Sequence, residues 1–138
     1  MITQEQRDKL REYFSTQPVE VVYLFGSQTN GKANKLSDVD LAVLFKEGLS
    51  QSERFDLRLE YMNKAGEILK MPDKTEVIDL KSVSLVFQRQ AIFLRDIIFE
   101  SDKSRRSVFE ARVNSRYFDY EYFIKENTKY SLASIGRV

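Results

Sequence analysis

The sequence predicts an α/β (α+β) fold, in which helices alternate with buried strands and a long helix ends the chain. Two mostly apolar runs, 19–25 and 39–45, are rich in β-branched and aromatic residues and lie next to turn residues such as Pro18 and Gly26. Apolar residues at helical spacing recur before and after these runs. With 138 residues, of which 42% are hydrophobic, the chain can form one domain with its own core.

The first elements follow from local signals. Thr3 and Gln6 form a T-x-x-Q capping pair, which predicts a helix over 4–14. Pro18 ends this helix, and the first strand follows it directly. The second strand, 39–45, is apolar on both faces beyond its acidic start, as expected for a strand that is covered on both sides.

The remaining elements alternate in the same way. In order, we expect a helix over 51–70, a strand over 75–80, a helix over 83–95 and a short strand over 97–99. A long helix is expected over about 104–127, and the polar tail from Thr128 is expected to be loose. The whole chain, 1–138, is therefore expected to be one domain, with a core over about 18–100 followed by the long helix.

Aromatic residues are concentrated on this C-terminal helix. Spacings of three and four produce one stripe that is expected to be core: Phe109, Val113, Tyr117, Tyr120 and Ile124. Phe118, Tyr122 and Phe123 fall outside the stripe. They are expected to form either a second packing face within the chain or a surface that binds a partner protein, because aromatic residues are enriched at interfaces.

The composition excludes several kinds of site. The chain has neither cysteine nor histidine, which excludes zinc sites built on these ligands, disulfides, thiol nucleophiles and Ser-His-Asp triads. A bound metal would need oxygen ligands, which favours Mg²⁺, Mn²⁺ or Ca²⁺. A net charge of +1 gives no basic footprint, so no direct contact with nucleic acid is expected. The polar N-terminus and the shortness of every apolar run predict a soluble, cytoplasmic protein without membrane contact.

The motif that carries chemistry joins the first two strands. Gly26-Ser27 ends the first strand, and after ten residues Asp38 and Asp40 open the second. Residues two apart on a strand point to the same side, so the two carboxylates converge, and their repulsion is normally offset by a divalent cation. The Gly-Ser turn offers backbone N–H groups and a hydroxyl to phosphates. The pattern therefore predicts a metal site beside a phosphate site, as in nucleotide chemistry.

A two-metal site usually needs a third carboxylate, and the strand over 75–80 offers two candidates. Glu76 and Asp79 are three residues apart, so a regular strand directs them to opposite faces and only one can join the Asp pair. We favour Glu76, because it lies at the beginning of its strand; Asp79 would then cap the next helix. Lys32 and Lys35 lie in the loop between the motif halves and are expected either to contact phosphates or to be solvated.

These residues resemble the nucleotidyltransferase superfamily that includes DNA polymerase β, and in particular its smallest branch, the minimal nucleotidyltransferases or MNT proteins. The branch pattern is Gly-Ser, ten residues, Asp-x-Asp and a later acidic strand residue, here Gly26-Ser27, Asp38, Asp40 and Glu76. The resemblance covers about residues 20–100. It implies a small mixed sheet flanked by helices, and it supports Glu76 over Asp79.

The resemblance also implies an activity and a partner. MNT proteins are often antitoxins, whose partner is a small helical HEPN ribonuclease and whose chemistry is transfer of AMP from ATP to a tyrosine of that toxin. By this resemblance Asp38, Asp40 and Glu76 hold two Mg²⁺ ions, and Gly26-Ser27 binds ATP phosphates. Many members have Arg where this chain has Asn30, and Lys32 or Lys35 is the candidate substitute. Two alternatives stay open: a steric antitoxin with little catalysis, and a nucleotidyltransferase that acts on a small-molecule hydroxyl.

Overall fold

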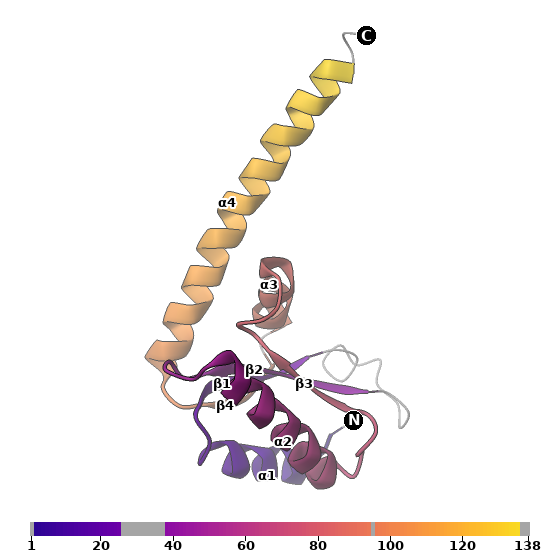
Figure 1. The fold of residues 1–138 in the computed structure, drawn as a ribbon, viewed down its shortest axis with the longest axis vertical. Coiled ribbons are helices and arrows are strands. Elements are labelled where there is room, and N and C mark those ends of the chain that lie inside the picture. Colours follow the sequence, from indigo (N-terminus) through magenta and orange to yellow (C-terminus); the bar gives the residue numbers. More distant parts are fainter. Residues whose placement is uncertain (1, 26–37, 95, 136–138) are drawn as a thin grey trace.

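The computed structural model describes residues 2–25, 38–94 and 96–135, which form a sheet with helices on both faces (Figure 1). The elements are α1 (Gln4–Phe14), β1 (Val19–Phe25), β2 (Val39–Phe45), α2 (Gln51–Leu69), β3 (Thr75–Asp79), α3 (Leu85–Leu94), β4 (Asp96–Glu100) and α4 (Lys103–Ile135). The four strands lie in the order β3-β2-β1-β4. β1 is antiparallel to both β2 and β4, while β2 and β3 are parallel, so the sheet is mixed as expected.

Local signals predicted most element boundaries well. The expected bounds of α1, β1 and β2 agree with the structure, and the capping box of Thr3 and Gln6 is formed. The expectation of a loose tail from Thr128 is wrong, because α4 continues to Ile135. The reason is that a polar sequence does not by itself end a helix, and the first glycine or proline beyond the start of α4 is Gly136.

One face of the sheet is closed by α1 and α2 (Figure 1). Alternate residues of β1 and β2, such as Val22 and Leu41, are fully buried there together with Phe14 and Tyr61. The rings of Phe14 and Tyr61 pack edge to face with centroids 5.2 Å apart. This face is the larger of the two cores and fixes the register of the strands that carry the acidic residues.

The opposite face is covered by α3 and by the first half of α4. Tyr23 on β1 is buried and donates a hydrogen bond of 2.8 Å to Glu110 of α4, whose carboxylate also accepts one of 3.0 Å from Arg106. Arg106 pairs with Glu100 of β4 as well. Burial, followed by the bond to Glu110, raises the pKa of Tyr23, so its hydroxyl stays protonated and donates. This network fixes the base of α4 to the sheet.

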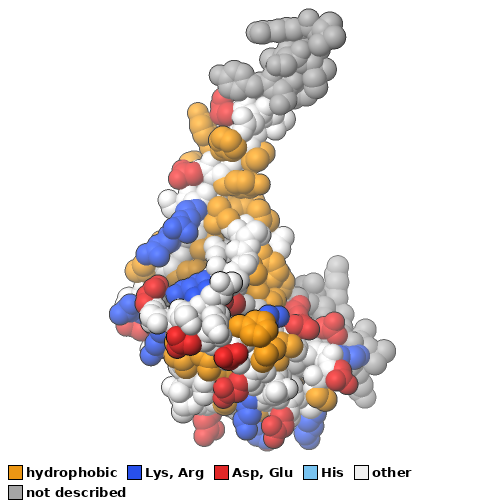
Figure 2. All heavy atoms as spheres, viewed as in Figure 1, with side chains coloured by type: hydrophobic (Ala, Val, Ile, Leu, Met, Phe, Trp, Pro, Cys, Tyr) orange, Lys and Arg blue, Asp and Glu red, His pale blue; other side chains and the backbone are white. Residues whose placement is uncertain are grey.

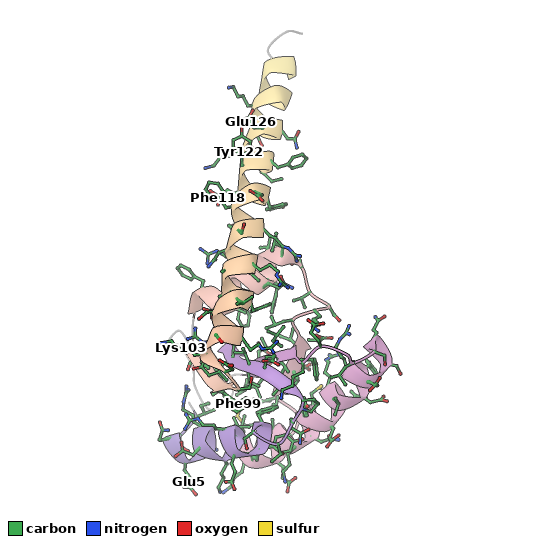
Figure 3. All side chains as sticks on the ribbon, turned by 90° about the vertical axis from the view of Figure 1, so that its left-hand side faces the viewer. Glu5, Phe99, Lys103, Phe118, Tyr122 and Glu126 are labelled. Atoms are coloured by element: carbon green, nitrogen blue, oxygen red, sulfur yellow. The ribbon has the colours of Figure 1, made fainter. Side chains whose placement is uncertain are left out.

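From Phe118 onward, α4 projects away from the body of the protein (Figure 3). We call residues 103–117 the proximal half of α4 and residues 118–135 its distal half. Phe118, Tyr122 and Phe123 are between 62% and 72% exposed, so the expectation of a second packing face within the chain is wrong. The predicted core stripe is also wrong in its last two members, since Tyr120 and Ile124 are each 43% exposed. Among the described helices, none is apolar enough over a sufficient length to cross a membrane.

Candidate acidic site

The candidate site lies at the edge of the sheet where β1 ends and β2 and β3 begin. The parallel register places Asp40 directly opposite Glu76. A backbone hydrogen bond of 2.8 Å from Val39 N–H to the carbonyl of Lys74 aligns the starts of the two strands. On the other side of β2, Phe25 is the partner of Asp40. Neighbouring strands are about 4.8 Å apart, so the two acidic residues are close neighbours.

The alternation of the strands decides which face the acidic side chains occupy. Val39 and Leu41 are buried in the core against α1 and α2, so Asp40 between them points to the face that carries α3. Val77 is buried in the same core, and Glu76 therefore shares the face of Asp40. Asp38, two residues before Asp40, is exposed beside it. The structure thus brings these three carboxylates to one edge and one face.

Their electrostatics follow from this placement. Burial of the half-buried Asp40 carboxyl, followed by the negative charges of Asp38 and Glu76, raises the pKa of Asp40. All three causes disfavour the ionised form of Asp40. A bound cation would reverse them by supplying the missing positive charge.

The donor set fits a hard divalent cation, although the side chains are not gathered around one. Within residues 2–25, 38–94 and 96–135, no three acidic side chains converge into a preassembled metal cluster. Asp38 and Glu76 are exposed and can reorient, and like charges favour their separation. The donors they share with Asp40 are carboxylate oxygens, which are the ligands that Mg²⁺ prefers.

Asp79 has different surroundings, on the face covered by α2. Its Oδ2 accepts hydrogen bonds from Arg54 Nε at 2.8 Å and from Ser82 Oγ at 3.0 Å. Its Oδ1 accepts one from the backbone N–H of Lys81 at 2.9 Å. The odd spacing from Glu76 therefore separates the two candidates as predicted. Asp79 closes the turn after β3 instead of capping α3, which begins later, at Leu85.

Several predicted site residues cannot be placed. Gly26, Ser27, Lys32 and Lys35 lie outside the described residues. The described chain stops at Phe25 and resumes at Asp38, and both positions adjoin Asp40.

One functional group near the site, the Arg89 side chain, was not predicted from the sequence. The Arg89 guanidinium of α3 lies 5.3 Å from the ring centroid of Phe93 and 5.4 Å from that of Tyr117 on α4. The spacing of four between Arg89 and Phe93 on a predicted helix was a usable signal for the first contact. The contact with Tyr117 depends on how α3 and α4 pack.

Comparison with known proteins agrees with this geometry. The family described as "Polymerase beta, Nucleotidyltransferase" matches residues 8–104. The chain belongs to this family. The nucleotidyltransferase fold expected from the Gly-Ser and Asp-x-Asp motifs is therefore confirmed, together with its mixed sheet and long C-terminal helix.

Individual relatives are more distant. The protein adenylyltransferase MntA of Shewanella oneidensis is 28% identical over 74 residues, which are 54% of this chain and 49% of MntA, so the similarity spans about half the length of that relative. A chain from a crystal structure of a toxin–antitoxin with AMP-PNP aligns with a TM-score of 0.65 at 22% identity, over 87% of this chain and 91% of its own. A complex of tri-AMPylated S. oneidensis HEPN toxin with MNT antitoxin gives a TM-score of 0.63 at 21% identity, over 88% and 91%.

Proposed function

We propose that this protein transfers AMP from ATP to a tyrosine hydroxyl of a HEPN-type ribonuclease toxin, and so acts as an antitoxin. The observation that carries the proposal is the alignment of Asp38, Asp40 and Glu76 on one edge of the sheet, in a chain of the nucleotidyltransferase family. The similarity to a protein adenylyltransferase and to toxin–antitoxin complexes supports the choice of acceptor. An ATP-consuming reaction needs the cytoplasmic nucleotide pool, so the proposed location is the cytoplasm.

Each residue has a proposed role. Asp38, Asp40 and Glu76 would hold two Mg²⁺ ions, which supply charge neutralisation for the phosphates when bound. Gly26 and Ser27, with Lys32 or Lys35, would bind the β- and γ-phosphates. Glu76 would accept the tyrosine proton. It lies directly opposite Asp40 on the neighbouring strand, and unlike Asp40 its side chain is exposed. The tyrosine oxygen forms a bond to the α-phosphorus, the bond from that phosphorus to the bridging oxygen breaks, and pyrophosphate leaves.

The partner surface is proposed to include the distal half of α4. Phe118, Tyr122 and Phe123 expose large aromatic surfaces there, and contiguous exposed apolar surface is unfavourable in water. An antitoxin that acts only by steric blocking would use the same surface but would not need the acidic residues. The catalytic and the steric hypotheses therefore differ in whether the acidic site is required.

The decisive experiment combines the protein with the purified product of a neighbouring gene that encodes a small helical protein, in the presence of Mg²⁺ and labelled ATP. We expect label to move to a tyrosine of that protein. The double variant Asp38→Asn with Asp40→Asn should reduce transfer by about 10²-fold or more, because two ligands are lost. Its thermal stability in EDTA should be kept or increased, since the repulsion between the carboxylates is removed as well.

The outcome separates the candidate functions. A double variant that still binds and silences the partner without transferring AMP would identify a steric antitoxin. A wild-type protein that leaves the partner unlabelled but modifies a small-molecule hydroxyl would identify the other alternative.

The third carboxylate can be assigned with a matched pair of variants. Glu76→Gln should abolish transfer with little change in the melting temperature, because the side chain is exposed. Asp79→Asn should retain substantial transfer but lower the free energy of unfolding by about 1–3 kcal/mol, since it weakens a largely buried ion pair with Arg54. The reverse pattern of the two results would assign the role to Asp79.

A further inference from the structure

An open trough between α3 and α4 begins immediately beside the acidic site. Phe25 is the strand partner of Asp40, and both side chains lie on the face that carries α3. Directly opposed residues on one face of an antiparallel pair have Cβ atoms about 4.5–5.5 Å apart. The ring of Phe25 also packs on Phe87 of α3, with centroids 4.7 Å apart. A ligand that contacts Phe25 in the trough therefore lies next to the residue that neighbours Asp40 on the adjacent strand.

The trough has a volume of about 540 Å³ and an aromatic lining. Its lining residues are Phe25, Arg89, Gln90, Phe93, Tyr117 and Glu121. Phe93 is 71% exposed although it is a large apolar side chain, and the Arg89 guanidinium lies over its ring. The same guanidinium contacts Tyr117 on the other wall, so a cation bridges two rings across the trough.

The charges of the trough suit a polypeptide better than a nucleotide triphosphate. Among the residues that the structure describes, its lining contains one cation, Arg89, and one carboxylate, Glu121, which also pairs with Lys125 at 3.3 Å. In this described lining the two charges balance, so its described side chains offer no excess positive charge to phosphates. It provides hydrogen-bond donors and acceptors, with Gln90, for a peptide backbone, and ring faces for an aromatic side chain.

The trough is also continuous with the distal half of α4. The ring of Tyr117 in its wall lies 6.3 Å from that of Tyr120, and Ile124 follows one turn later, with both of these exposed. Hydrophobic atoms run down the projecting helix toward the body of the protein (Figure 2). A partner that contacts the distal half of α4 thus meets a largely aromatic path that ends at Phe25, the strand partner of Asp40.

We propose that this trough seats the acceptor segment of the partner protein, with its tyrosine ring against Phe93 and Phe25 and its hydroxyl at the acidic edge. Arg89 is then a positioning residue, because it fixes Phe93 and Tyr117 as the two walls. The inference rests on the proposed function and adds to it the path by which the acceptor reaches Asp40.

The test uses the full chain with its purified partner, Mg²⁺ and ATP. The double variant Arg89→Ala with Phe93→Ala should raise the KM for the partner by about 10–100-fold, the range expected when two interface anchors are removed. The KM for ATP should not change. Phe55→Ala is the matched control, because Phe55 is 53% exposed on α2, on the other side of the sheet, and it should alter neither KM. A melting curve verifies that each variant is folded.

A second measurement does not depend on AMP transfer. A photo-crosslinking amino acid at position 93 should join the partner in the segment that contains the acceptor tyrosine. Such a crosslink with no AMP transfer by the wild type would refute the proposed chemistry and leave the docking trough intact. An increase in the KM for ATP alone would show that the trough holds the nucleobase, and an unchanged KM for both substrates would show that it holds neither; each result overturns the inference.

Discussion

The two halves of α4 contain similar residues in very different surroundings. In the proximal half, Val113 is 2% exposed and Glu110 is 6% exposed, and both are held against the sheet. In the distal half, Tyr120 and Ile124 continue the same stripe and are each 43% exposed. Phe118 and Tyr122 lie on nearly the opposite side of the helix from Tyr120, since successive residues are about 100° apart. The described part of the distal half therefore exposes large apolar residues on more than one side, with charged residues such as Asp119 and Lys125 between them.

This difference shows what hydrophobic periodicity reports. It identifies which residues of a helix avoid water, and it does not identify what covers them. Large apolar residues that are exposed together on a helix mark an interaction surface. Since the body of this protein covers one side of the proximal half only, we expect a partner to cover the exposed aromatic residues of the distal half.

The largest effect should come from placing the same charge on the same stripe in each half. Val113→Asp should lower the free energy of unfolding by about 3 kcal/mol or more, because it buries an unpaired carboxylate. Ile124→Asp should change it by less than about 0.5 kcal/mol. Urea denaturation of the free protein measures both. Equal destabilisation by the two variants would mean that the distal half is packed in solution, which contradicts the comparison.

A smaller effect should appear in partner binding. Tyr122→Ala with Phe123→Ala should weaken the complex by about 1–4 kcal/mol, the usual range for aromatic truncations at interfaces. The free protein should remain folded and bind ATP normally. Phe55→Ala with Leu59→Ala is a matched control, because these residues are also exposed but lie on α2. Calorimetric titration of the partner decides the matter; normal affinity of the Tyr122 and Phe123 variant would place the interface elsewhere.

The smallest expected effect concerns stability at the acidic site, which should be independent of both halves of α4. The pKa of Asp40 is raised above its ordinary value of 3.8, so the folded protein binds this proton more tightly than the unfolded chain does. Stability is therefore lost as the pH rises from about 3.8 through the raised pKa, and the loss is complete at neutral pH. Asp40→Asn removes the ionisable group and with it this loss of stability. In EDTA at pH 7 the variant should therefore melt about 1–2 °C higher than the wild type.

The higher melting temperature of Asp40→Asn should disappear at pH 3. At pH 7 the increase should be the same in an Ile124→Asp background. A lower melting temperature for Asp40→Asn in EDTA at pH 7 would show that the carboxylate has a stabilising partner, and the metal-site interpretation would then lose its electrostatic basis.

Much of the fold could be predicted because its signals are local. The cap at Thr3 and the turn residues Pro18 and Gly26 define α1 and β1 without reference to the rest of the chain. β4 runs over Asp96–Glu100, two residues longer than the expected 97–99, because its ends are fixed by pairing with β1. The predicted end of α4 at about residue 127 is wrong, because polar residues alone do not stop a helix, which continues to Ile135.

The site could be predicted only in part. Period-two alternation correctly separated Glu76 from Asp79, and the ion pair with Arg54 now explains the position of Asp79. The alignment of Asp40 with Glu76 depends on a parallel register between strands separated by a long helix, which the sequence does not state. The same applies to the network of Tyr23, Glu110 and Arg106 and to the trough, since each joins elements that are distant in the sequence.

The projection of α4 has a consequence for turnover. The helix is 33 residues long, or about 50 Å, so its distal half can hold a partner far from the bond that changes. A surface that never touches the reacting hydroxyl binds substrate and product almost equally. Under the proposed function, tethering in this way would keep the acceptor at a high effective concentration, and we expect it also to make release of the modified partner the slow step. Rapid-quench kinetics should then show a burst of one labelling event per complex followed by a slow steady state.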